Sequence, residues 1–113
     1  MDSILDTIKD MLDIEPTFDG FDNEIIVHIN SALMSLHQLG IGPEDGLAIS
    51  DDTAVWADLF DGLSNIEAVK SYIWLNVRLL WDPPGTSFLV ESINKQIETY
   101  AWRLTVQVDE LSA

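Results

Sequence analysis

The chain has no cysteine, few basic residues and no long hydrophobic run, and each absence excludes a class of protein. Without cysteine, neither a disulfide framework nor a thiolate metal site can form. Five basic residues against 20 acidic ones leave a formal net charge of −15, which argues against binding nucleic acid by neutralising its phosphates. The longest uncharged apolar stretch, residues 71–77, is far shorter than the roughly 20 residues of a membrane span.

The start of the chain also lacks the basic residues of a secretory signal, because Asp2 and Asp6 are acidic. We therefore expect a soluble protein that is not exported by this route and has no membrane partner. Hydrophobic residues make up 47% of the 113 residues and charged residues 22%, a composition typical of globular proteins. A chain of this length buries roughly two-thirds of its unfolded surface, so residues 1–113 are predicted to form a single domain.

Apolar residues recur every three or four positions in several segments, which predicts an all-α fold, a small bundle of about four to five helices. The predicted helices cover residues 3–13, 22–39, 53–60, 64–82 and 86–108. The first belongs to an acidic N-terminal segment, residues 1–14, and residues 109–113 are expected to fray. Residues 40–52, rich in glycine and aspartate, predict a long loop in which residues 47–49 form a short extended segment.

Polar residues at the predicted helix starts are interpreted as caps. Ser3 and Asp22 each precede an apolar pattern and can accept a hydrogen bond from a free amide of the first turn. Ser64 followed by Glu67 is a capping-box pattern, in which each side chain satisfies an amide at the helix start. These signals define where the first, second and fourth predicted helices begin.

The breaker Asp82-Pro83-Pro84-Gly85 predicts a helical hairpin. Proline cannot continue a helix and moves its predecessor out of the α region, so the fourth helix must end near Asp82. Thr86 or Ser87 can cap the next helix, which then packs antiparallel on the fourth. The fourth helix is apolar on nearly every side, and its main stripe is Ile66, Val69, Ile73, Val77 and Leu80. The matching stripe on the last helix is Leu89, Ile93, Ile97, Tyr100, Leu104 and Val108.

Phe88, Lys95 and Trp102 lie seven residues apart on the other side of the last helix. They can rest against the first helix or the long loop, or they can form an interface with another subunit, because large aromatics beside a long basic stem anchor protein contacts. Arg78, on so apolar a helix, is expected to need an acidic partner. The remaining tryptophans, Trp56, Trp74 and Trp81, are interpreted as core residues.

Acidic residues are unevenly distributed. Residues 1–62 hold 14 acids and one lysine, a net charge of −13, whereas residues 63–113 hold 6 acids and 4 bases, a net charge of −2. Acids four residues apart disfavour an isolated helix, yet one face of the first helix carries Asp2, Asp6, Asp10 and Asp13. This face is either solvated, turned toward a basic partner, or the lining of a passage through which DNA slides without sticking.

No reactive constellation is found in the sequence. His28 and His37, the only histidines, lie about half a turn apart on their helix and cannot share a metal ion. The acids within residues 19–24 and 44–46 do not match the ligand positions of an EF-hand loop. We therefore expect no catalytic, cofactor-binding or metal site and no enzyme activity.

Residues 65–85, NIEAVKSYIWLNVRLLWDPPG, followed by residues 91–104, have the order helix, Asp-Pro-Pro breaker and helix. In this order they resemble the family of head-tail connector, or adaptor, proteins of long-tailed bacteriophages. Residues 39–46, LGIGPEDG, together with residues 49–51 and Trp56, are similar to its loop region. These are structural signatures rather than catalytic ones.

The resemblance, which covers about residues 22–108, implies a structural virion protein. It implies an all-α subunit of a ring, expected to be a dodecamer in the virion and a monomer when free, that joins the capsid portal protein to the stopper or tail protein. DNA would pass through the ring without specific binding, at the head-tail interface of a virion assembled in the bacterial cytoplasm. The candidate interface residues are Phe88, Lys95, Trp102, Asp6, Asp10 and Asp13.

The charge alone suggests an alternative function, an acidic mimic of DNA that inhibits a basic nucleic-acid-binding protein. Such a mimic needs acids spaced like phosphates over its entire surface. The nearly neutral residues 63–113 weaken this alternative.

Overall fold

The computed structural model describes residues 3–42, 48–60 and 66–112, with side chains as far as residue 106. Over these residues the chain forms five helices and no named strand, which confirms the all-α prediction. The helices are α1 (Ile4–Met11), α2 (Asp22–Gln38), α3 (Trp56–Phe60), α4 (Ile66–Trp81) and α5 (Ser87–Ser112).

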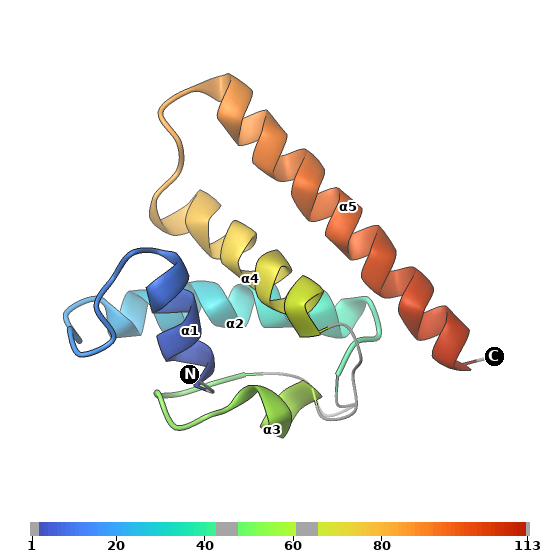
Figure 1. Cartoon of the computed structure of the whole chain (residues 1–113), viewed down its shortest axis with the longest axis horizontal. Helices are drawn as coiled ribbons and strands as arrows, with labels where there is room; N and C mark the ends of the chain where they lie inside the picture. The colour runs from blue at the N-terminus through green and yellow to red at the C-terminus, as the bar shows by residue number, and fades with distance from the viewer. Residues whose placement is uncertain (1–2, 43–47, 61–65, 113) are drawn as a thin grey trace.

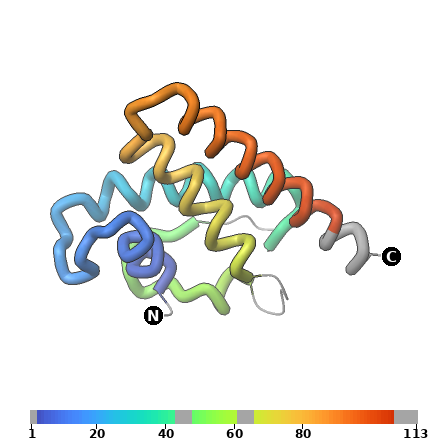
Figure 2. The backbone as a smooth tube through the Cα atoms, turned by 45° about the horizontal axis from the view of Figure 1, so that its top comes forward, coloured from blue at the N-terminus to red at the C-terminus, as the bar shows by residue number. Residues whose placement is uncertain are grey.

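α4 is the central helix of the bundle. It packs against α2 and also against α5, which runs back along it after the double proline, so the predicted hairpin is present (Figure 1). α1 packs against α2 and α4, and both views place it across α4 from α5 (Figure 2). The outward faces of α1 and α5 therefore lie on different sides of the molecule.

The buried core consists of the apolar faces that the periodicity predicts. α4 buries side chains on more than one side, as expected for a helix in the middle of a bundle: Ala68, Val69, Tyr72, Ile73, Leu75 and Val77. α1 contributes Ile4, Leu5 and Ile8, and α2 contributes Ile25, Ile29, Ala32, Leu33 and Leu36. From α5, Ile93 and Leu104 are buried, while Ile97 and Tyr100 pack at the edge of this core.

Two residues of the predicted stripes are exposed instead. Leu80, near the end of α4, is 56% exposed and Leu89, near the start of α5, is 47% exposed. Both flank the Asp82-Pro83-Pro84-Gly85 corner, Leu80 at the end of α4 and Leu89 at the start of α5. Prediction of their burial from the stripe alone was wrong, because the period of a helix does not indicate how far its partner extends.

The helix caps follow the predictions at two starts and differ at one. The Asp6 backbone N–H donates to Ser3 Oγ (3.2 Å), and the Leu89 backbone N–H donates to Thr86 Oγ1 (3.3 Å). Asp22 is not a cap: it is the first residue of α2, the cap position is Phe21, and no side chain caps this start. Ser64 lies outside the described residues.

The end of the long loop is fixed by one asparagine of α2. Asn30 Nδ2 donates to the Ile49 carbonyl (2.9 Å), and the Ile49 N–H donates to Asn30 Oδ1 (2.7 Å). These two bonds give buried Ile49 the partners that a strand would supply, and residues 48–50 form no strand, whereas residue 47 is not described. Farther on, the Thr53 hydroxyl and N–H donate to Asp51, which holds the pKa of that exposed carboxyl below its ordinary value.

The start of α1 is tied to the segment that leads into α3. Ser3 and Val55 form an isolated antiparallel bridge, and the Ile4 N–H donates to the Ala54 carbonyl (3.0 Å). Trp56 Nε1 donates to Thr7 Oγ1 (3.1 Å), so the buried indole has a partner on α1. The short α1 and α3 thus support each other.

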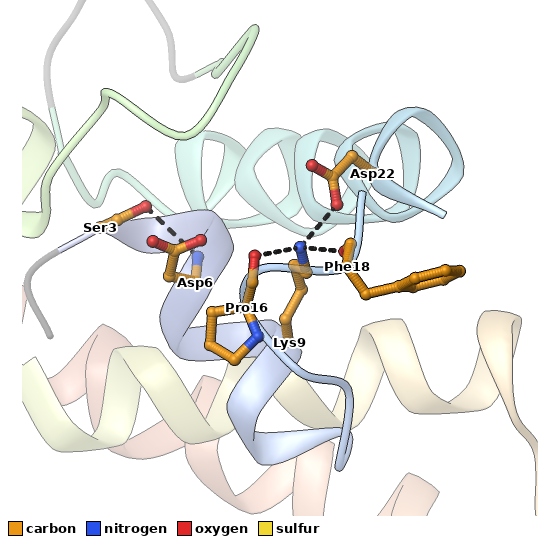
Figure 3. A network of polar contacts seen from close by, with 6 residues as sticks. All are labelled: Ser3, Asp6, Lys9, Pro16, Phe18 and Asp22. Carbon is orange, nitrogen blue, oxygen red and sulfur yellow. Dashed lines mark hydrogen bonds and ion pairs between the residues drawn. The ribbon is translucent and has the colours of Figure 1, made fainter. Parts of the chain in front are cut away.

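The end of α1 is held by Lys9, whose side chain is only 1% exposed (Figure 3). Its ammonium donates to the carbonyls of Pro16 (2.9 Å) and Phe18 (2.6 Å), in the connection between α1 and α2. Asp22 Oδ1 lies 2.8 Å from the same nitrogen, an ion pair without hydrogen-bond geometry. One buried charge therefore joins α1, the connection and the first turn of α2.

We expect the substitution Lys9→Met to destabilise the fold by about 3 kcal/mol. This is the lower end of the cost of breaking a buried ion pair, because the Asp22 side chain keeps 26% of its surface in water. Met fills the volume of the lysine stem but leaves two carbonyls and a carboxylate without a donor. The measurement is urea unfolding, with Lys95→Met, an exposed lysine on α5, as the control that should change stability by less than about 0.5 kcal/mol. Equal midpoints for the two variants would contradict this role of Lys9.

Candidate interaction surfaces

The outward face of α5 carries the most exposed aromatic side chains of the described residues. Phe88 is 76% exposed and Trp102 is 67% exposed, and Lys95 between them is also exposed. Residues seven apart return to nearly the same side of an α-helix, so the three side chains form one row. We call this row the α5 stripe.

The α5 stripe faces away from the bundle. Lys95 is nine residues from buried Leu104, which at about 100° per residue is half a turn. The interpretation that these side chains rest against α1 or the long loop is therefore wrong, because Phe88 and Trp102 are mostly in water. The interface interpretation remains as a prediction.

Basic side chains are exposed at only one place in the described part of the chain, on α5. Lys9 is buried and Arg78 is half-buried. Lys70 is paired, because its Nζ lies 3.4 Å from Glu67 Oε1 and over the Trp56 ring. The other two, Lys95 and Arg103, are exposed and make no ion pair with a described side chain, and we call them the basic edge of α5. They border a shallow hollow of about 330 Å³ lined by Ser92, Lys95, Gln96, Thr99, Tyr100 and Arg103.

The acids predicted to lie on one face of α1 do not all lie on an exposed surface. Asp6 is half-buried beside its cap, whereas Asp10 and Asp13 are exposed, and Asp2 is not described. Asp13 has a φ of 63°, the left-handed conformation that aspartate tolerates better than most residues, and it ends the helix. Asp10, Asp13 and exposed Glu15 line a shallow hollow of about 200 Å³ with Ile14 and Pro16. We call these three acids the acidic patch.

Arg78 does not have the acidic partner that its position on α4 predicted. Asp13 and Asp82 line a small hollow of about 110 Å³ with it, but no ion pair of Arg78 is found among the described residues. The guanidinium is half-buried rather than buried, so water supplies the solvation that a paired acid would otherwise provide.

The three tryptophans that were interpreted as core residues differ in burial. Trp56 is buried, which confirms the interpretation for this residue. Trp74 and Trp81 are half-buried and pack against the edge of the core, so the interpretation holds only in part for them.

An exposed aromatic cluster was missed in the sequence. Phe21 packs against Phe18 in an edge-on arrangement (centroids 5.3 Å apart) and against Trp81 (4.7 Å). Phe18 and Phe21 are still 49% and 40% exposed. Two phenylalanines in the turn-rich stretch after α1 were the available signal, but only the tertiary fold brings them to the end of α4.

The described residues include no group of three or more histidines and acids arranged to hold a metal ion. His28 is half-buried and His37 is exposed on α2. No helix in the described ranges is both long and apolar enough to span a lipid bilayer. The features that stand out are therefore surfaces for contact, the α5 stripe, the basic edge and the acidic patch.

Residues 4–111 match a protein-family model whose description is "Phage connector protein". The match begins at the first residue of α1 and ends one residue before the end of α5, so it includes the whole hairpin and the loop region. No curated protein and no solved structure matches the chain.

We expect Trp102→Ala to change the free energy of unfolding by less than about 0.5 kcal/mol, because this side chain contributes little to the packed core. Leu104→Ala, two residues away on the buried side of the same helix, is expected to cost about 2–5 kcal/mol. Urea unfolding of the two variants measures the difference. A large loss for Trp102→Ala would mean that the stripe packs within the subunit and is not a free surface.

Proposed function

The chain belongs to the phage connector protein family, and from this premise we propose that it joins the capsid portal to the stopper or tail as a subunit of a ring around the DNA channel. As a member of that family it is a structural phage protein that interacts with other head or tail proteins, and its place is in the virion. The finer assignment, to a ring between portal and tail, is the proposal.

The α5 stripe is the observation that carries the proposal. A structural joint works through protein contacts, and aromatic side chains are enriched where such contacts are strongest. Two large aromatics at 76% and 67% exposure leave apolar surface that a partner can cover. The long, rigid α5 presents them on one face, so little conformational entropy is lost on docking.

The charge supports passage of DNA without binding. A net charge of −15 repels phosphates, and at physiological salt this repulsion acts over about 8 Å, the distance that matters at the wall of a channel. The alternative, an acidic mimic of DNA, would need a surface covered with acid. The exposed Lys95 and Arg103 and the apolar α5 stripe do not fit that requirement, so we do not propose it.

The test of this function uses purified portal rings from the same phage. We expect the protein to bind them and to form a ring on them, measured as co-sedimentation and as added mass in native mass spectrometry. A protein that ignores portal and tail assemblies at every concentration would overturn the proposal.

We further expect Phe88→Ala combined with Trp102→Ala to reduce the yield of tailed particles at least tenfold when the variant is the only copy available during infection. The lost aromatic contacts weaken the joint, whereas the subunit itself stays folded because both side chains are exposed. Electron microscopy counts joined and unjoined heads. Val27→Ala with Met34→Ala, which removes two exposed apolar side chains from α2, is the matched control. An unchanged yield for the α5 variant would show that the α5 stripe is not part of the joint.

A further inference from the structure

We propose that the basic edge of α5 in one copy of the chain binds the acidic patch after α1 in a second copy. The inference rests on the proposed ring and deepens it by naming the two surfaces that meet. The basic edge is Lys95 and Arg103, and the acidic patch is Asp10, Asp13 and Glu15.

The first support is charge complementarity. In a chain of net charge −15, the exposed basic side chains of the described residues gather on one side of one helix, without an ion pair there. Glu91 and Glu98, four residues before and three after Lys95, lie beside it on the side away from Arg103, and neither makes an ion pair with it. Eight residues separate Lys95 from Arg103, about 12 Å along the helix, which is wide enough to contact more than one acid.

The second support is the shape and chemistry of the two surfaces. The acidic patch borders a hollow of about 200 Å³ that also has Ile14 and Pro16 in its lining, and the basic edge borders a hollow of about 330 Å³ with Tyr100 in its lining. Phe88 and Trp102 flank Lys95 on α5. Aromatic side chains and arginine are enriched in protein interfaces, and Phe88, Trp102 and Arg103 supply both on this side of α5.

The third support is where the surfaces lie in the molecule. α1 and α5 pack on different sides of α4, so the two surfaces cannot meet within one copy (Figures 1 and 2). A contact between two different surfaces is heterologous, and repeated copies of it generate a ring when the rotation closes. A two-fold dimer would instead require both contacts to form at once between the same two copies, and surfaces on different sides of the molecule do not favour that arrangement.

The test is a charge swap between copies. One variant carries Lys95→Glu and Arg103→Glu on α5, and the other carries Asp10→Lys and Glu15→Lys in the acidic patch. Asp13 is left unchanged because its left-handed φ of 63° disfavours lysine. Native mass spectrometry and sedimentation at physiological salt measure the masses of each variant alone and of their equimolar mixture.

We expect each variant alone to associate at least tenfold more weakly than the wild type, because its own surfaces repel each other. The mixture should regain the wild-type affinity, since Glu on α5 of one variant then meets Lys in the patch of the other, and the unchanged surfaces also match. A wild type and a mixture that both stay monomeric up to the solubility limit would overturn the proposal, and so would variants that associate as the wild type does.

Two controls separate local contact from total charge. The patch variant has a less negative net charge than the wild type, so repulsion between whole molecules alone predicts stronger association, the reverse of our expectation. Asp19→Lys with Asp52→Lys gives the same net charge at two other exposed positions and should not weaken association. The chain with all four substitutions keeps the wild-type net charge of −15 and should associate again.

The outcome is distinguishable from failure of the proposed function. Wild-type protein that binds portal rings while the mixture fails to assemble would refute this contact and leave the connector role intact. Assembly that follows the charge swap, without any binding to portal or tail, would support this contact and refute the connector role.

Discussion

The buried ammonium of Lys9 determines how the front half of the chain folds. α1 has eight residues, fewer than an isolated helix needs to be stable in water, and its acids at four-residue spacing make it weaker still. Its stability must therefore come from packing and from contacts with the rest of the chain. Removing a lysine from water is costly, and the cost is offset only when the Pro16 and Phe18 carbonyls and the Asp22 carboxylate all lie within reach. The α1 position, the turn and the start of α2 are thus fixed together or not at all.

This use of Lys9 shapes the surface as well as the core. Residues 1–62 contain a single base, and it is inside, so the surrounding acids have no positive neighbour from their own half of the chain. The same turn brings Phe18 and Phe21 to Trp81 at the end of α4. The burial of its only lysine therefore leaves the surface of the front half without a base of its own, and any positive charge that meets it has to come from the rear half of the chain, as Arg78 does in the hollow that it lines with Asp13, or from another molecule.

The helices could be predicted because their signals are local. Three- and four-residue spacing located α1, α2, α4 and α5, and the double proline located the corner between α4 and α5. Lys9 was not recognised as buried, because a lysine on a helix is ordinarily solvated and its acceptors are backbone carbonyls that no sequence pattern marks. Asp22 was assigned as a cap for the same reason: its residue type and position fit a cap, and only the tertiary fold shows that its carboxylate binds Lys9 instead. The helix period also predicted that Phe88, Lys95 and Trp102 share one side of α5. No sequence pattern indicates which molecule contacts that side.

The proposed ring places opposing electrostatic requirements on a strongly acidic protein. Repulsion between whole copies opposes their association and also opposes binding of DNA, yet the proposed ring needs contacts between those same copies. The distribution of charge in this chain reconciles the two, because the repulsion is spread over the front half while the exposed bases are concentrated on α5. At physiological salt, charges farther apart than about 8 Å are screened, so docked surfaces respond to their nearest partners and not to the total. Association then requires an orientation in which the basic edge of one copy faces the acidic patch of the next, because only there does short-range attraction exceed the screened repulsion between whole molecules.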